Sequence, residues 1–136
     1  MQTLKIHTKG NNDIINITEN IQEVLNKSNL KAKSGIINLC VIGSTAGLTT
    51  IEYEPNLNKD FQEFFNKIIP EGDYHHHETW HDDNGHSHVR ASLLKPDLTV
   101  PFQDGKLVLG TWQQIILMDF DTRSRDREIA VTILKE

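Results

Sequence analysis

Six of the seven histidines in this 136-residue chain fall within fifteen residues, from Tyr74 to His88. The same segment also carries carboxylates and an indole ring, from Glu78, Trp80, Asp82 and Asp83. Neutral imidazole is the commonest protein ligand for transition metals, and it exchanges protons near neutral pH. Because crowding imidazoles together adds nothing to core packing, the segment predicts a functional site, most simply one for a divalent metal ion.

The spacing of these histidines limits which of them can share one ion. His86 and His88 point to the same side of an extended backbone, with Cα atoms roughly 6.5–7 Å apart, but positions i and i+2 of an α-helix do not face each other. A chelating pair therefore requires His86 to precede any helix, and Gly85 would ease the necessary backbone angle. Four other histidines compete for the place of third ligand: His75, His76, His77 and His81.

Three histidine ligands would leave a coordination position open, as in catalytic zinc sites, and Glu78, Asp82 and Asp83 could orient the imidazoles. Zinc is the expected cofactor, although nickel, cobalt and copper also accept three imidazoles. Two simpler interpretations stay open. The segment could be a solvated loop with incidental metal affinity, or an acid–base cluster that works without metal.

Apolar and alternating segments predict the strands that position this region. They cover residues 4–8, 13–17, 35–42, 48–53, 98–102, 106–109, 111–120 and 128–134. The strand at 35–42 is apolar enough to be covered on both sides, and it is expected to form a hairpin with 48–53. Asp104-Gly105 predicts a second hairpin.

Helical spacing predicts a first helix that is N-capped by Thr18 and buries Ile21, Val24 and Leu25. A second helix carries a phenylalanine stripe from Leu57 to Ile69 and ends at Pro70. Residues 71–85 lack an apolar period and predict a functional loop, and residues 89–94 predict a short helix. The expected fold is α+β: a mainly antiparallel β-sandwich with two main helices and one short helix, in one domain spanning residues 1–136.

Composition excludes several classes of protein. A net charge of −5 and an apolar fraction of 37% suit a core-forming domain without the basic stripe of a nucleic-acid surface. No apolar run reaches 18 residues, and the N-terminus lacks the apolar region of a signal peptide. The lone Cys40 lies in an apolar strand and predicts a structural thiol. A cytoplasmic location, with no nucleic-acid or membrane partner, is expected.

Other polar residues could bind an anionic substrate. The segment 43–47 offers the hydroxyls of Ser44 and Thr45, or it is a plain turn. Cationic candidates are Arg90, Lys95, Arg123, Arg125 and Arg127, of which Arg125 and Arg127 are more simply a solvated hairpin tip. Further candidates for a pocket or a subunit interface are Glu52, Thr111, Trp112 and Gln113.

Several blocks of this chain, in order, resemble a known family. They are Gly-Ser-Thr-Ala-Gly-Leu-Thr-Thr-Ile-Glu-Tyr-Glu-Pro (43–55), Asp-Asn-Gly-His-Ser-His-Val-Arg-Ala-Ser-Leu-Leu (83–94), Leu-Thr-Val-Pro (98–101), Leu-Gly-Thr-Trp-Gln-Gln (109–114) and Asp-Phe-Asp-Thr-Arg (119–123). The resemblance covers essentially the whole chain, and it is to the YjbQ-like family, also called the secondary thiamine-phosphate synthase family.

The resemblance implies a compact α+β fold with a β-sandwich, a homotrimer around packed sheets and a weak thiamine-phosphate synthase activity. That activity joins a pyrimidine diphosphate to a thiazole phosphate and releases pyrophosphate. It also implies that His76 and His88 occupy the family's histidine positions and that His86 belongs to a His-Ser-His subgroup. Many relatives carry histidine where this chain has Ser44, so either His86 compensates or the chemistry differs.

Together these observations predict a metal-binding enzyme that acts on a small phosphorylated substrate. The expected metal ligands are His76, His86 and His88, and with Arg90 they form the expected catalytic set. Phosphate oxygens would be bound by Ser44, Thr45 and Arg90, and the remaining substrate contacts would come from Glu52, Thr111, Trp112, Gln113 and Arg123. The alternatives are a non-catalytic metal- or ligand-binding homotrimer and a metal-dependent hydrolase.

Overall fold

The computed structural model describes residues 1–28 and 34–136, and in these it contains eight strands and four helices. The strands are β1 (Gln2–Thr8), β2 (Asp13–Asn16), β3 (Ser34–Ile42), β4 (Ala46–Glu52), β5 (Asp97–Gln103), β6 (Lys106–Leu107), β7 (Gln113–Asp119) and β8 (Arg125–Lys135). The helices are α1 (Thr18–Lys27), α2 (Pro55–Ile68), α3 (His75–Trp80) and α4 (Gly85–Leu94).

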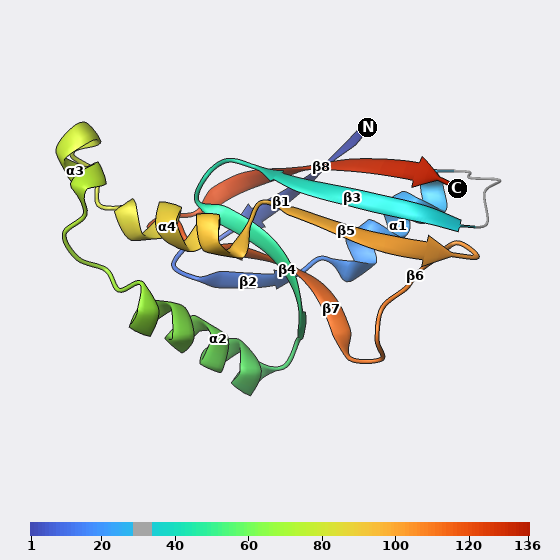
Figure 1. The fold of residues 1–136 in the computed structure, drawn as a ribbon, viewed down its shortest axis with the longest axis horizontal. Helices are drawn as coiled ribbons and strands as arrows, with labels where there is room; N and C mark the ends of the chain where they lie inside the picture. Colours follow the sequence, from blue (N-terminus) through green and yellow to red (C-terminus); the bar gives the residue numbers. More distant parts are fainter. Residues whose placement is uncertain (29–33) are drawn as a thin grey trace.

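The strands form two antiparallel sheets. One has the order β1-β8-β3-β5-β6, and the other has the order β2-β7-β4. Figure 1 shows α2, α3 and α4 gathered at one end of the molecule, with the β5–β6 hairpin and the C-terminus at the other. The α+β class and the antiparallel sheets are confirmed, with four helices where three were expected.

The main core lies where the two sheets face each other. Alternate residues of β3, Ile37, Leu39 and Val41, are buried and pack with Leu48 and Leu117 of the smaller sheet. Helix α1 adds Ile21 to this cluster, Val24 packs against it, and Leu25 is also buried, as the helical spacing predicts. A second apolar cluster joins the other face of β7 to α2 through its largest members, Phe65 and Phe120, whose ring centroids are 4.8 Å apart.

The expected hairpin between residues 35–42 and 48–53 is wrong. Strands β3 and β4 follow each other in sequence but belong to different sheets. Gly43, with φ of 119°, turns the chain at this corner, and β4 pairs with β7 instead. The expectation that β3 is covered on both sides is also wrong for the part of the chain that the structure describes, because Ile36 and Ile42 are exposed on its outer side.

Residues 71–85 are not a structureless loop. They contain α3, and α4 begins at Gly85, four residues before the expected helix at 89–94. Helix α3 has no buried residue, so it lacks the apolar stripe by which helices are recognised in a sequence. It ends at His81, whose φ of 55° is left-handed.

Three other boundaries differ from expectation. Thr18 is the first residue of α1 rather than its cap, and its hydroxyl accepts a hydrogen bond from the backbone of Ile115 at 2.8 Å. Helix α2 begins at Pro55 and is capped by the carboxylate of Glu54. Thr111 and Trp112 form a turn before β7 rather than part of a strand. The Asp104-Gly105 hairpin is confirmed, with φ of 50° and 75°.

None of the helices in the described residues is both long and apolar enough to cross a membrane.

Candidate functional site

Helices α3 and α4 bring two of the expected site histidines together. The rings of His76 on α3 and His88 on α4 meet edge to face, with centroids 4.5 Å apart. Nε2 of His76 lies 3.6 Å from Oδ1 of Asp82. We call His76 and His88 the histidine pair.

The surroundings of His88 keep its imidazole neutral. Burial and the neighbouring His76 lower its pKa below the usual value of about 6.5. Asp82, the backbone of Ser44 and Asp121 act in the opposite direction, but the lowering prevails. At neutral pH, one ring nitrogen of His88 therefore has a free lone pair with which to bind a cation or accept a proton.

A cavity of about 280 Å³ lies beside Asp82. All of its lining residues are polar or charged: Asp82, Asp83, Asn84, Asp121, Thr122 and Arg123. With its amide nitrogen turned toward Asp82, Asn84 donates to Oδ1 at 3.1 Å and Oδ2 at 3.3 Å. The lining of the cavity thus has three carboxylates and one cation. The cation, Arg123, is one of the residues that the sequence predicted to contact an anionic substrate.

A buried ionic network holds Asp121, one of the residues that line this cavity. Arg127 donates to both carboxylate oxygens of Asp119 at 2.7 Å, and its Nη2 also donates to the hydroxyl of Thr45. Thr45 donates to Asp121 at 2.9 Å, and Arg125 donates to the same oxygen at 2.9 Å. Burial opposes ionisation of Asp121, but the hydrogen bonds from Thr45 and Arg125 outweigh it, so the pKa of Asp121 is lowered.

This network corrects two expectations. Arg127 is not part of a solvated hairpin tip, because it is buried and paired with Asp119. Thr45 does not offer a free hydroxyl to a phosphate, because both its donor and its acceptor capacities are used inside the fold. Asp119 and Arg127 were missed as site-supporting residues. Asp119 could have been recognised from the sequence, because a carboxylate that directly follows the apolar run 115–118 is expected to be buried and therefore to need a partner.

His86 lies apart from the histidine pair. It is 3% exposed, and its neighbours are Tyr74, with ring centroids 6.2 Å apart, and Glu71, 3.9 Å from Nε2. Its Nδ1 is buried without a hydrogen-bond partner. Burial, then the charge of Arg90, lower its pKa.

The expected ligand set of His76, His86 and His88 is therefore not assembled. His86 and His88 both lie inside α4, where residues two apart project in different directions. Within residues 1–28 and 34–136, no group of three or more His, Cys, Asp or Glu side chains is arranged to hold an ion.

Arg90 has a structural position instead of the expected phosphate-binding one. It is 2% exposed, its Nε and Nη2 donate to the carbonyl oxygen of Ile69 at 2.9 and 2.7 Å, and its Nη1 donates to Asn12 at 2.8 Å. Burial lowers its pKa. The guanidinium thus ties α4 to the end of α2 and to the turn before β2.

Ser44 is exposed and its backbone reaches His88, so it stays at the site. Arg123 lines the cavity, whereas Glu52, Thr111, Trp112 and Gln113 lie elsewhere. Glu52 pairs with Gln113 at one end of the β4–β7 ladder, whereas Ala46 pairs with Asp119 at the other. Six residue steps separate these ends, or about 20 Å at 3.4 Å per residue. Thr111, Trp112 and Gln113 are therefore far from the histidine pair of the same chain.

The remaining histidines of the segment have other positions. Nε2 of His77 accepts a hydrogen bond from the backbone of Gly85 at 3.0 Å, which fastens α3 to the start of α4. His75 is fully exposed, and His81 closes α3 in its left-handed conformation. None of these three imidazoles is thus assigned to the candidate site.

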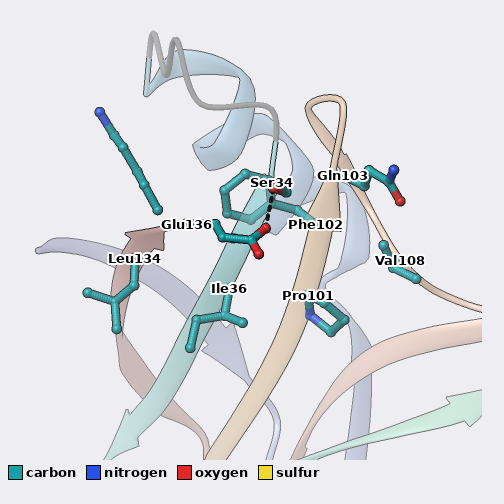
Figure 2. A pocket seen from close by; sticks show the side chains of 10 residues that line it. Ser34, Ile36, Pro101, Phe102, Gln103, Val108, Leu134 and Glu136 are labelled. Atoms are coloured by element: carbon teal, nitrogen blue, oxygen red, sulfur yellow. Dashed lines mark hydrogen bonds between the residues drawn. The ribbon is translucent and has the colours of Figure 1, made fainter.

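A larger cavity of about 740 Å³ lies at the opposite end of the five-stranded sheet. Figure 2 shows its apolar lining by Ile36, Pro101, Val108 and Leu134, with Ser34 hydrogen-bonded to Glu136. Ile36 and the corner residue Ile42 are six residues apart on β3, about 20 Å. The larger cavity is thus remote from the histidines and holds none of the expected site residues.

The fold and the site define a class of protein: a two-sheet α+β domain whose α3–α4 helices present a histidine pair beside an acidic cavity. A family model described as UPF0047 protein YjbQ-like matches residues 2–136, and this chain belongs to that family.

Two relatives illustrate the family. A UPF0047 protein of Archaeoglobus fulgidus is 32% identical over 131 residues, covering 96% of this chain and 98% of the relative. A UPF0047 protein of Methanothermobacter thermautotrophicus is 33% identical, covering 97% and 90%.

Two solved structures share the fold. An uncharacterised YjbQ/UPF0047 protein from Clostridium acetobutylicum has a TM-score of 0.88 at 31% identity, covering 98% of this chain and 100% of that one. A YbjQ-like protein of unknown function from Sulfolobus solfataricus has a TM-score of 0.87 at 31% identity, covering 99% and 97%. These likenesses confirm the family and the fold.

Proposed function

We propose that this protein is an enzyme acting on a small phosphorylated substrate, and that the two imidazoles of the histidine pair are this chain's ligands for the divalent ion on which that activity depends. The observation that carries the proposal is the 4.5 Å contact between the rings of His76 and His88, with Asp82 3.6 Å from His76. Imidazole nitrogens suit zinc and its neighbours, with Asp82 beside His76 to orient its ring. This ligand set replaces the one that included His86.

The charge of the cavity supports a role for a cation. Asp82, Asp83 and Asp121 repel a free phosphate, and Arg123 alone does not balance them. A phosphorylated substrate fits this cavity as a metal complex, with its oxygens toward Arg123 and the exposed hydroxyl of Ser44. Buried Arg90 and Thr45 hold the surrounding elements in place.

The family resemblance suggests a particular reaction. In a thiamine-phosphate synthase, the bond between the pyrimidine methylene and diphosphate breaks, the thiazole nitrogen forms a C–N bond to that methylene, and pyrophosphate leaves. A divalent ion would neutralise charge on the leaving group.

A homotrimer is also proposed, as the family resemblance implies. The outer face of the five-stranded sheet supports self-association, because the residues at its centre are uncharged except for Asp97. On this face Ile36 pairs with Leu134 and Pro101, Asn38 with Thr132 and Thr99, and Cys40 with Ala130 and Asp97. Depletion of charge at the centre of a surface is typical of interfaces.

Titration of untagged protein with Zn²⁺ and Co²⁺ in a calorimeter tests the metal site. About one ion per chain is expected in the wild type, with at least tenfold weaker binding in His76→Ala and His88→Ala, since each substitution removes one of the two imidazole ligands. His75→Ala is the matched control because its ring is fully exposed on the same helix. Unchanged binding in both test variants would refute the metal site.

Product analysis then separates the activities. With the pyrimidine diphosphate and thiazole phosphate, the synthase forms thiamine phosphate and pyrophosphate, whereas a hydrolase releases the corresponding alcohol and phosphate. Metal binding with no turnover that depends on His76 and His88 would favour a non-catalytic binding protein.

A further inference from the structure

The cavity beside the histidine pair has no apolar wall. Its six lining residues are Asp82, Asp83, Asn84, Asp121, Thr122 and Arg123. Small-molecule sites are ordinarily lined by apolar and aromatic groups, with a few polar ones that fix orientation. If the phosphorylated substrate contains an organic ring, this cavity supplies polar contacts for the phosphate but no apolar contact for the ring.

An aromatic group of the required kind is exposed elsewhere on the same chain. Trp112 is 72% exposed, in the turn that joins β6 to β7. The turn is nevertheless well fixed. The backbone N–H of Gln113 donates to Gly110 at 3.0 Å, its side-chain oxygen accepts from the Gly110 N–H at 3.0 Å, and its side-chain nitrogen donates to Thr50 at 2.9 Å. A large aromatic side chain on a preorganised turn is typical of a binding contact.

Trp112 cannot reach the histidine pair of its own chain. The β4–β7 ladder places the turn at the Gln113 end and the cavity at the Asp119 end, about 20 Å away. Figure 1 shows the same separation, with the β6–β7 connection at the lower edge and α3 at the upper left.

The end of the molecule that carries the cavity has its own uncovered apolar surface. Val89 and Leu93 lie one helical turn apart on α4 and are 46% and 58% exposed, and Val89 directly follows His88. Each chain thus exposes an apolar surface at both ends of the ladder. Contact between unlike ends is a heterologous interface, which closes into a ring when the rotation permits. A ring of three would be such an assembly.

We propose that the site is shared between copies of this chain, with the Gly110–Gln113 turn of a second copy packing on Val89 and Leu93 and placing its indole over the cavity beside the histidine pair. This inference rests on the proposed function for the identity of the site. Trp112 of the partner subunit then stacks on the ring of the substrate, while the histidine pair and Arg123 face its phosphorylated part.

Cross-linking between copies tests the shared site without requiring any substrate. In a Cys40→Ser background, one preparation carries Trp112→Cys and another carries Val89→Cys. After the two are mixed and allowed to exchange subunits, a short bifunctional maleimide is expected to link unlike chains to each other and to leave each preparation alone unlinked. A chain with both substitutions is expected to yield linked species larger than a dimer, because each copy contacts two different neighbours. Lys59→Cys, exposed on α2, replaces Val89→Cys in the matched control.

A monomer in sedimentation, or linking no better than in the Lys59→Cys control, would overturn the shared site. A second readout uses Trp80→Phe, which leaves Trp112 as the only tryptophan. Co²⁺ is expected to quench its emission at least twofold more in this variant than in the same variant carrying His88→Ala. Cross-linking without quenching would support the shared site and refute the metal site, whereas metal binding without cross-linking would refute the shared site alone.

Discussion

The ring of His88 on α4 meets the ring of His76 on α3 at a centroid distance of 4.5 Å, although twelve positions separate them in sequence. This contact depends on how closely α3 approaches the start of α4. Gly85 begins α4, and a Cβ at this position would lie 2.5 Å from Cβ of Tyr74 and 2.9 Å from Nε2 of His77. The contact between His76 and His88 therefore depends on the absence of a side chain at Gly85, the first residue of α4.

Gly85→Ala is expected to displace α3 and to separate the histidine pair. Accommodating the methyl group requires a shift of the Tyr74 backbone, with a loss of about 1–3 kcal/mol in stability. Urea unfolding measures the loss, and Co²⁺ affinity reports on the pair. Gly72→Ala is the matched control, since a Cβ at Gly72 meets nothing within 4 Å. Equal behaviour of the two variants would contradict the packing described for Gly85.

Arg90→Lys separates a structural role from a ligand-binding one. Lysine cannot reproduce the paired donation from Nε and Nη2 to Ile69 together with the bond to Asn12. We expect a loss of at least about 2 kcal/mol in the free energy of unfolding, because hydrogen bonds from charged donors contribute about 1.5–3 kcal/mol each. Phosphate affinity, compared at equal folded fraction, is expected to stay unchanged. If Arg90→Lys lost phosphate binding but kept normal stability, Arg90 would instead have the phosphate-binding role that the sequence predicted.

Asp119→Asn is expected to be among the more destabilising substitutions in the described chain. It removes the charge that pairs with buried Arg127, and loss of one member of a buried ion pair costs about 3–5 kcal/mol. Urea unfolding again provides the measurement. Glu128→Gln breaks the exposed pair with Lys5, so it should change stability by less than about 0.5 kcal/mol. A loss below about 1 kcal/mol in Asp119→Asn would mean that the network is not needed for stability.

The sheets could be predicted because their cause is local. Alternation of inward and outward residues in β3 and β8, and the Asp104-Gly105 turn, are set by neighbours in sequence. The switch of β4 to the second sheet could not be predicted, since it depends on pairing with β7, which lies more than sixty residues away. Helix α3 was missed because it buries no residue and so leaves no apolar period.

The sequence indicated residue types for the candidate site but not how they are arranged. His76, His88, Ser44 and Arg123 lie at or beside the cavity, and their roles in binding stay predictions. His86 was assigned to the same ion as His88 because residues two apart face the same side of an extended backbone. Both residues lie inside α4, where residues two apart face different sides. The partners of Arg90 and Thr45 are distant in sequence, so nothing local indicated that both side chains are used inside the fold.

The pH dependence of stability follows from the two histidines whose pKa is lowered by burial, His86 and His88. In the unfolded chain both bind protons near pH 6.5, whereas in the folded protein they stay neutral to lower pH. The unfolded state therefore binds more protons below about pH 6.5, and stability is expected to fall as the pH drops from about 6.5 through the lowered folded values.

Urea unfolding at pH 7.5 and at pH 5.5 measures this effect. His86→Gln is expected to flatten the decline between the two values, since glutamine does not titrate. His75→Gln, whose ring is fully exposed, should leave the decline as it is in the wild type. If His86→Gln keeps the full wild-type decline, protonation of this buried ring does not limit stability, and other groups must account for the pH dependence.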